Sequence, residues 1–201
     1  AHGDLGYSYR RNRPIADMIG ERLPWTLLLT GSSLVLANLI GVTLGATAAW
    51  RRAGRYDLGL LGLAALLHAV PPFWLGMVLI ALLAVRWPLL PAFGAVTPWQ
   101  TYTGCAHVVD VLRHLALPVA TLTMVGVPGV FMTTRYAMLG VLGQEYITVA
   151  RAKGLPERQV LFRHALRNAL LPVTTNLALS LGFAFGGATV IETVFSYPGV
   201  G

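Results

Sequence analysis

Residues 23–50 read LPWTLLLTGSSLVLANLIGVTLGATAAW, a run of 28 residues without one charged side chain. A hydrocarbon core about 30 Å thick takes roughly 20 helical residues to cross, so this run is long enough. Gly41 and Gly45 stand four residues apart and form a small-xxx-small face that lets another helix pack closely. The stretch therefore predicts a transmembrane helix over about 23–50.

The composition of the whole chain points the same way. Hydrophobic residues make up 55% of it and charged residues only 11%, where a soluble domain carries about a quarter. The formal net charge is +7, but the basic residues gather between apolar runs, as orientation in a membrane requires. Nucleic-acid binding is therefore not expected. Cys105 is the one cysteine, so no disulfide forms within the chain.

Three further apolar runs follow, and none shows the period-two alternation of a barrel strand. We predict an all-α, polytopic transmembrane helix bundle. Its four spans are expected over about 23–50, 58–85, 115–139 and 169–195. Prolines and glycines interrupt the last three spans, with Pro71 and Pro72 in the second and Pro118 and Pro128 in the third. An interior proline costs a helix about 3 kcal/mol. The breaks suit either a bundle that encloses a path or simple kinking for packing.

The connecting segments predict the orientation. Residues 51–57 (RRAGRYD) and the loop 140–168 are rich in arginine and lysine, whereas 86–114 holds only two arginines. By the positive-inside rule the first two are cytoplasmic, so 1–22 and the turn 196–201 are external. Four arginines depart from this rule because they precede the first span. They are Arg10, Arg11, Arg13 and Arg22.

The loop contains ARAKGLPERQVLFRHALRN over residues 150–168, with five Lys or Arg against one Glu. We expect one helix over 144–153, ended by Gly154 as a left-handed C-cap, and a second with Pro156 in its first turn. Gln159, Arg163 and Arg167 recur every four residues and place a cationic stripe on one face. Such a helix either rests on anionic lipid or docks on a soluble partner.

Five segments in order carry a family resemblance: GDLGYSYR (3–10), PPFWLG (71–76), RHLALP (113–118), EYITVARAKGLPERQVLFRHALRNALLPV (145–173) and IETVFSYPGVG (191–201). Together they resemble the inner-membrane permease subunit of an ABC importer, in the dipeptide, oligopeptide and nickel branch. The first and second segments favour the first of the two paired permeases. In the family's EAA loop, residues 148–150 here read Thr-Val-Ala in place of Glu-Ala-Ala, and Arg167 replaces a later proline.

The resemblance implies a type I permease of six spans, whose first and last spans would lie outside these 201 residues. It implies a bacterial or archaeal cytoplasmic (inner) membrane, a second permease, two cytoplasmic ATP-binding subunits and an extracytoplasmic solute-binding protein, besides membrane lipid. Small peptides are the expected cargo, ahead of nickel complexes or glutathione-like molecules. Loop 140–168 would couple to the ATPases, with Gly154 giving the sharp turn, small alanines allowing close approach and cations meeting acidic partner residues. The expected coupling residues are Thr148, Ala150, Arg151, Ala152, Lys153, Gly154, Leu155, Arg158 and Arg163.

No catalytic or metal-binding pattern is present, so we expect no enzyme activity and no cofactor in this chain; ATP and Mg would be bound by partner subunits.

Arg135 is expected to reach the cytoplasmic interface. Glu192 lies near the outer end of the last span, where an unpaired ionisable group costs a few kcal/mol, so an ion pair or gate is expected. The candidate translocation path or gate comprises His68, Pro71, Phe73, Trp74, Asn176 and Glu192. A lone histidine such as His68 is more often a packing residue than a ligand. The alternative function is a membrane scaffold or enzyme-complex subunit whose basic loop binds lipid.

Overall fold

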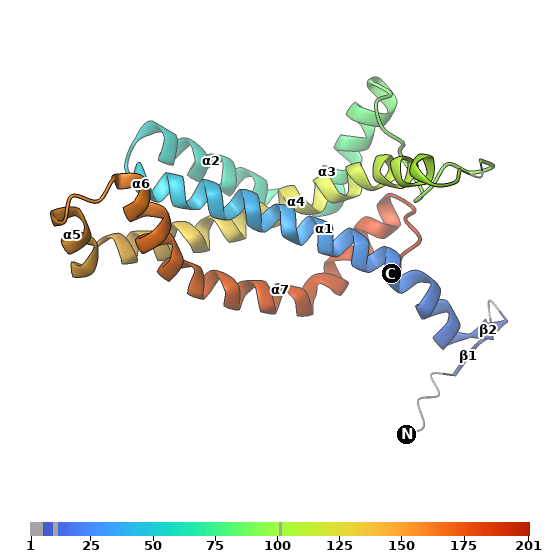
Figure 1. The fold of residues 1–201 in the computed structure, drawn as a ribbon. Helices are drawn as coiled ribbons and strands as arrows, with labels where there is room; N and C mark the ends of the chain where they lie inside the picture. The colour runs from blue at the N-terminus through green and yellow to red at the C-terminus, as the bar shows by residue number, and fades with distance from the viewer. Residues whose placement is uncertain (1–5, 10–11, 101) are drawn as a thin grey trace. The chain divides into compact units, whose positions relative to one another are not determined.

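The computed structural model describes residues 6–9, 12–100 and 102–201, and this part of the chain is mostly helical (Figure 1). In chain order the elements are β1 (Tyr7–Ser8), β2 (Arg13–Pro14), α1 (Ile15–Trp50), α2 (Arg55–Ala69), α3 (Pro72–Leu79), the π-helix η1 (Ile80–Arg86), α4 (Cys105–Leu142), α5 (Glu145–Ala152), α6 (Glu157–Gln159), the π-helix η2 (Val160–Leu166) and α7 (Arg167–Val194). The two strands form a two-residue antiparallel ladder. The predicted all-α class is confirmed.

Two of the described helices, α1 and α4, are each long and apolar enough to cross a membrane. Helix α2 followed by α3 and η1 meets the same test only as a broken pair. Helix α1 begins at Ile15, eight residues before the predicted span, and α4 begins at Cys105, ten residues before its own. At a rise of 1.5 Å per residue, α4 is about 57 Å long, nearly twice the hydrocarbon thickness. Helix α7 covers the fourth predicted span, whose membrane crossing stays a prediction.

The prediction that prolines and glycines break the last three spans was wrong for two of them. Helix α4 runs through Pro118 and Pro128, and α7 runs through Gly182, Gly186 and Gly187. A single proline removes only one backbone donor, so the ladder continues on either side of it. Pro71 and Pro72 are adjacent and remove two donors. The residue before them, Val70, is forced into extended backbone (ψ 127°), and helix α2 ends there.

The described residues fall into two compact units, which we describe separately. The first lies within Ala1–Ser32, Pro72–Leu122 and Ala184–Gly201, and the second within Ser33–Pro71 and Thr123–Phe183. The core of the first unit gathers side chains from α1, α4, the end of α7 and the segment after η1. Its buried members are Leu29, Ala95, Leu115, Leu117, Val119, Ile191, Phe195 and Tyr197.

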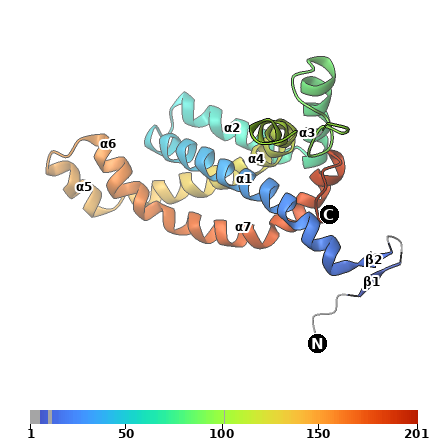
Figure 2. The ribbon, with the colours of Figure 1, turned by 45° about the vertical axis from the view of Figure 1, so that its right-hand side comes forward.

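In the second unit, the predicted glycine face of α1 packs against α4. A Cβ atom on Gly41 would lie 2.6 Å from Val130 Cβ, and one on Gly45 would lie 2.7 Å from the Phe131 carbonyl oxygen. Neither position has room for a side chain, because ordinary contacts begin at 3.4 Å. Figure 2 shows the hairpin of α5 and α6 connecting α4 to α7 at one end of this unit.

Candidate functional site

The loop between α4 and α7 forms the predicted helix-turn-helix. Helix α5 ends at Ala152, and Gly154 follows with φ +74°, the left-handed conformation that glycine adopts without strain. Its N–H donates to the Arg151 carbonyl oxygen at 2.9 Å, and the Leu155 N–H donates to the Ala150 carbonyl oxygen at 3.4 Å. Pro156, in extended backbone, precedes α6, and its carbonyl oxygen accepts the Gln159 N–H at 2.8 Å.

The second helix of the loop differs from the prediction in its geometry. Residues 160–166 form a π-helix, and this continues without a break into α7. The predicted faces are nevertheless present: Leu161 and Ala165 are buried, whereas Arg163 is exposed. No feature of the sequence marked the change to π-helical bonding.

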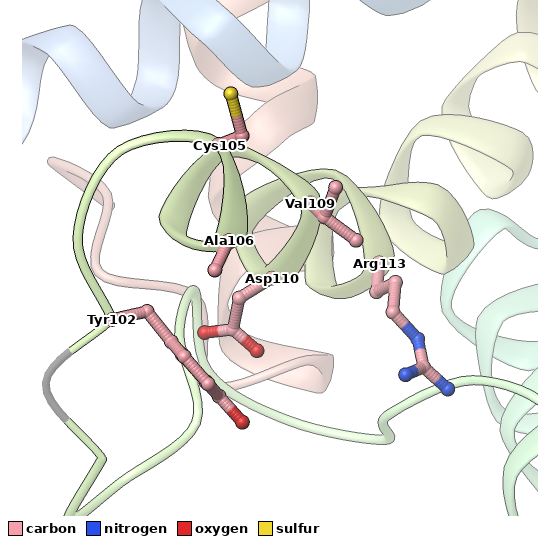
Figure 3. Close-up of a pocket in the computed structure, with 6 residues that line it drawn as sticks. All are labelled: Tyr102, Cys105, Ala106, Val109, Asp110 and Arg113. Carbon is pink, nitrogen blue, oxygen red and sulfur yellow. The ribbon is translucent and has the colours of Figure 1, made fainter.

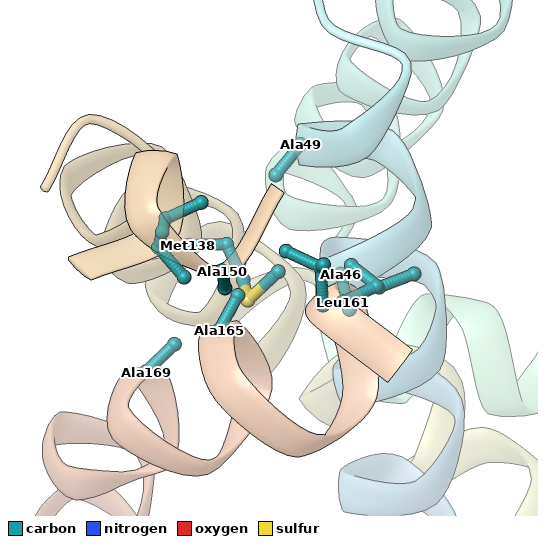
Figure 4. Packing of buried hydrophobic residues seen from close by; sticks show 9 residues of the cluster. Ala46, Ala49, Met138, Ala150, Leu161, Ala165 and Ala169 are labelled. Carbon is teal, nitrogen blue, oxygen red and sulfur yellow. The ribbon is translucent and has the colours of Figure 1, made fainter. Parts of the chain in front are cut away.

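A buried apolar cluster fixes the loop to the ends of α1 and α4 (Figure 4). It brings together Ala46, Ala49, Met138, Ile147, Ala150, Val160, Leu161, Ala165 and Ala169. Met138 of α4 and Ile147 of α5 are fully buried in it, and Leu155 packs against its edge. The Tyr146 hydroxyl also accepts a hydrogen bond from Asn168 Nδ2 at 2.8 Å, which ties the start of α5 to the start of α7. The loop is therefore part of the folded unit.

The role predicted for Ala150 needs correction. Its side chain is 5% exposed and lies in this cluster, so its small size lets the chain's own helices approach one another and not a partner. Thr148 and Ala152 are exposed on α5 and remain accessible.

The outer face of the loop carries the predicted cations. Arg151 is partly engaged, because its Nε donates to Glu157 Oε1 at 3.2 Å and its guanidinium lies 5.4 Å from the centre of the Trp50 ring. Lys153, Arg158 and Arg163 are exposed, and within the described residues none of them makes a side-chain hydrogen bond or ion pair. Three positive charges are thus presented to the surroundings.

Apolar side chains lie among these charges. Val149 is 51% exposed and Phe162 is 47% exposed. Pro156, Arg158, Gln159 and Phe162 line an open groove of about 480 Å³. A face that mixes an exposed aromatic ring with arginines is typical of the surfaces at which proteins bind one another. We call the exposed residues Val149, Lys153, Arg158, Phe162 and Arg163 the outer loop face.

A second buried polar site lies in the first unit, around Glu192. Its carboxylate accepts hydrogen bonds from Thr26 Oγ1 at 2.5 Å and from the Gly201 N–H at 2.8 Å. The predicted ion pair is not found within the described residues, where no cation contacts Glu192, and the alternative role as a gate stays a prediction. A Cβ on Gly199 would collide with the carboxyl group, so only glycine lets the turn close over it. Arg22 Nη1 donates to the Gly199 carbonyl oxygen at 3.1 Å, which gives one of the unexplained basic residues a partner.

Next to it, Tyr197 is buried and packs edge-on against the Trp25 ring, with the centroids 5.9 Å apart. Its hydroxyl has no hydrogen-bond partner among the described residues. Burial, with a smaller contribution from the Glu192 charge, raises the pKa of Tyr197 to about 12. The phenol therefore stays neutral well beyond its usual range.

The other residues proposed for a path are divided between the two units. His68 and Pro71 are exposed at the end of α2, and Phe73 and Trp74 are exposed on α3. Asn176 Nδ2 donates to Thr133 Oγ1 at 3.5 Å, which links α7 to α4 as expected of a polar residue facing another helix. Phe73, Trp74 and Glu192 belong to the first unit and the other three to the second. Their role in transport stays a prediction.

An ion pair that sequence reasoning missed joins α2 to α4. Arg135 Nε and Nη2 donate to Asp57 Oδ1 and Oδ2 at 2.6 and 2.7 Å, a bidentate arrangement. Asp57 also accepts the Ala53 N–H at 3.0 Å, and its side chain is 1% exposed. Arg135 therefore pairs inside the unit, and its position relative to the membrane interface stays a prediction. The available signal was an acid directly before the second apolar run, in RRAGRYD.

A shallow pocket of about 340 Å³ lies beside the first turns of α4 (Figure 3). The carboxylate in its lining, Asp110, already has partners: it accepts the Thr97 N–H at 2.7 Å and the Thr97 hydroxyl at 2.6 Å. Figure 3 shows the Cys105 sulfur pointing to the opposite side of the helix from Asp110. Across the described ranges, no group of three or more His, Cys, Asp or Glu could hold a metal ion.

The long apolar helices indicate an integral membrane protein, and one of its loops presents cations from a packed base. Residues 41–201 match the family model described as binding-protein-dependent transport system inner membrane component, and the chain belongs to this family. The recognised resemblance is thereby confirmed.

The similar proteins are named as peptide permeases. The chain is 36% identical to the dipeptide transport system permease protein DppB of Escherichia coli (strain K12), over 100% of the chain and 64% of that protein. It is 40% identical to the oligopeptide transport system permease protein AppB of Bacillus subtilis (strain 168), over 99% and 62%. A putative peptide permease protein of Brucella suis biovar 1 is 38% identical over 99% and 61%. The chain thus spans less than two thirds of the length of these relatives.

Proposed function

We propose that this chain belongs to a permease subunit that forms the translocation path of a binding-protein-dependent ABC importer. Its partners in this proposal are a second permease, two cytoplasmic ATP-binding subunits and an extracytoplasmic solute-binding protein. The membrane is the cytoplasmic membrane of a bacterium or archaeon. The subunit itself carries out no ATP hydrolysis, and the ATP-binding subunits hold ATP and Mg.

The observation that carries the proposal is the outer loop face. A basic interfacial helix on lipid would lay its apolar side in the membrane and keep its cations at the headgroups. Here the loop's main apolar side, Leu161 with Ala165, is buried in the protein's own core. What remains outside is an irregular mixture of Lys153, Arg158 and Phe162, which suits a protein partner with acidic and apolar groups.

The fold also supports transmission of force from this face. Residues 157–194 run through α6, η2 and α7 without an interruption, so a displacement of the loop is passed to α7 directly. The buried Met138 connects the same loop to α4. Closure of two ATP-binding subunits would push on the loop and rock the permease between two arrangements, a rigid-body switch.

Small peptides are the proposed cargo. The support is the similarity to relatives named as dipeptide and oligopeptide permeases. Nickel complexes and glutathione-like molecules remain rival cargoes, to be separated by competition against labelled peptide uptake.

The test replaces Gly154 by leucine in the full-length subunit, assembled with its partners in proteoliposomes. Gly154 has φ +74° and open space around its Cα, so leucine fits sterically but strains the turn by about 1–2 kcal/mol and reshapes the docking face. ATP-dependent uptake of a labelled dipeptide should be lost while membrane insertion is unchanged. The matched control is Gly140→Leu on the last turns of α4, which also has open surroundings but an ordinary helical backbone. Uptake that survives Gly154→Leu at the level of the control would contradict the proposal.

A further inference from the structure

The Asp57–Arg135 ion pair lies one helical turn from the point where the loop contacts α4. Arg135 and Met138 are three residues apart on α4, so they lie on neighbouring turns of the same side. Arg135 holds Asp57 of α2, and Met138 is buried in the cluster that contains the loop residues Ile147 and Ala150. A short stretch of α4 therefore contacts both the loop and α2.

Helix α2 has few other attachments within its unit. Its buried residues are Asp57 and Ala64 alone, while Leu58, Leu63 and Leu66 are each more than half exposed. One apolar cluster packs beneath it. Its buried members are Ala48, Ala64 and Phe131, and Leu44, Leu60, Leu61 and Met132 pack against them partly buried. Apolar contacts of this kind are not directional and permit sliding, whereas a bidentate ion pair specifies one geometry.

Among the described residues, α2 makes one other side-chain hydrogen bond to a neighbouring helix, and it is weaker. The Tyr56 hydroxyl and Thr47 Oγ1 are 3.2 Å apart, and both side chains are exposed. Asp57, by contrast, is 1% exposed. Both of its carboxylate oxygens accept hydrogen bonds from Arg135, and Oδ2 also accepts one from the Ala53 N–H. The hydrogen bond to Ala53 holds the RRAGR segment against the start of α2. The neighbouring residues 56 and 57 thus supply a matched pair of variants, one on each connection.

We propose that the Asp57–Arg135 ion pair is the mechanical joint through which α2 follows the coupling loop, so that both are positioning residues for transport. The inference rests on the proposed function, because it names how movement of the loop reaches α2, which ends at Ala69 beside His68 and Pro71. Without the joint, the loop still seats on its cluster and still engages the ATP-binding subunits. ATP binding and hydrolysis in those subunits then move α4 without moving α2 by the same amount.

The test measures dipeptide uptake and ATP hydrolysis together, in proteoliposomes that contain the full transporter and its binding protein, with radiolabelled dialanine as the probe. Asp57→Asn should lower the number of dipeptides taken up per ATP by about fivefold, the lower end of typical couplings between sites, while hydrolysis continues. Tyr56→Phe, the matched control, should leave this ratio unchanged. The charge swap Asp57→Arg with Arg135→Asp should restore much of it.

The outcomes separate the joint from a structural role and from the proposed function. If Asp57→Asn leaves the ratio at the level of Tyr56→Phe, or lowers uptake and hydrolysis in equal proportion, the ion pair is structural and the inference is overturned. If the swap fails to raise the ratio above that of Asp57→Asn while the complex assembles normally, the inference is also overturned. If the unmodified transporter hydrolyses ATP without taking up any dipeptide, the proposed function is contradicted, and the inference, which depends on it, is overturned as well.

Discussion

Replacing Gly45 by alanine is the sharpest test of the packing between α1 and α4. The added Cβ would lie 2.7 Å from the Phe131 carbonyl oxygen and 2.8 Å from Thr134 Cβ, against ordinary contact at 3.4 Å. The nearest atom belongs to the backbone, so the helices must move apart locally by about 0.7 Å, and overpacking of this kind costs about 1–3 kcal/mol. Alanine also gains about 1 kcal/mol of helix propensity, which masks part of the cost.

The matched control is Gly31→Ala in the same helix, where an added Cβ meets nothing within 4 Å. The propensity gain is common to both variants, so their difference isolates the steric cost. For a chain of this size, 1 kcal/mol shifts Tm by about 2–4 °C. Thermal unfolding of the full-length subunit in nanodiscs should therefore give a Tm about 2–12 °C lower for Gly45→Ala than for Gly31→Ala. Equal Tm values would refute close packing at Gly45.

Three further changes test the two buried sites. Glu192→Gln should lower the free energy of unfolding by about 1–3 kcal/mol, because its amide nitrogen cannot accept the hydrogen bond from Thr26 or Gly201; an unchanged Tm would contradict these contacts. Tyr197→Phe should be neutral or stabilising below pH 10, since the buried hydroxyl lacks a partner among the described residues. The raised pKa means that the unfolded chain loses the phenolic proton first, so stability should fall as pH rises from about 10 to about 12, and Tyr197→Phe should remove that slope in pH-dependent melts. Met138→Ala should cost about 2–5 kcal/mol and increase hydrogen exchange in α5, and unchanged exchange there would show that Met138 does not hold the loop.

Local features of the fold were predictable from the sequence. An uncharged run of 28 residues leaves little choice but a membrane helix, and its glycines at positions 41 and 45 marked the face that packs on α4. Gly154 followed by Pro156 identified the turn of the loop, because each restricts the backbone by itself. These signals need no knowledge of distant residues.

Features that depend on tertiary contacts were not predictable. Ala150 reads as part of an exposed docking motif, and only the position of Met138 shows that it faces inward. Asp57 and Arg135 are 78 residues apart, so nothing local pairs them. Glu192 was expected to need a cation, but Thr26 and a turn closed by glycine satisfy its carboxylate. Prolines within α4 gave a false break signal because isolated prolines are tolerated in long apolar helices.

The central claim is that a cytoplasmic ATP-binding subunit seats on the outer loop face. A photo-reactive phenylalanine analogue at position 162, with the same analogue at Leu58 of α2 as control, tests it directly in membranes that hold the assembled transporter. Both native side chains are exposed, at 47% and 61%. The account predicts a protein adduct to the ATP-binding subunit from position 162 and lipid adducts from position 58. Lipid adducts alone from position 162 would contradict it.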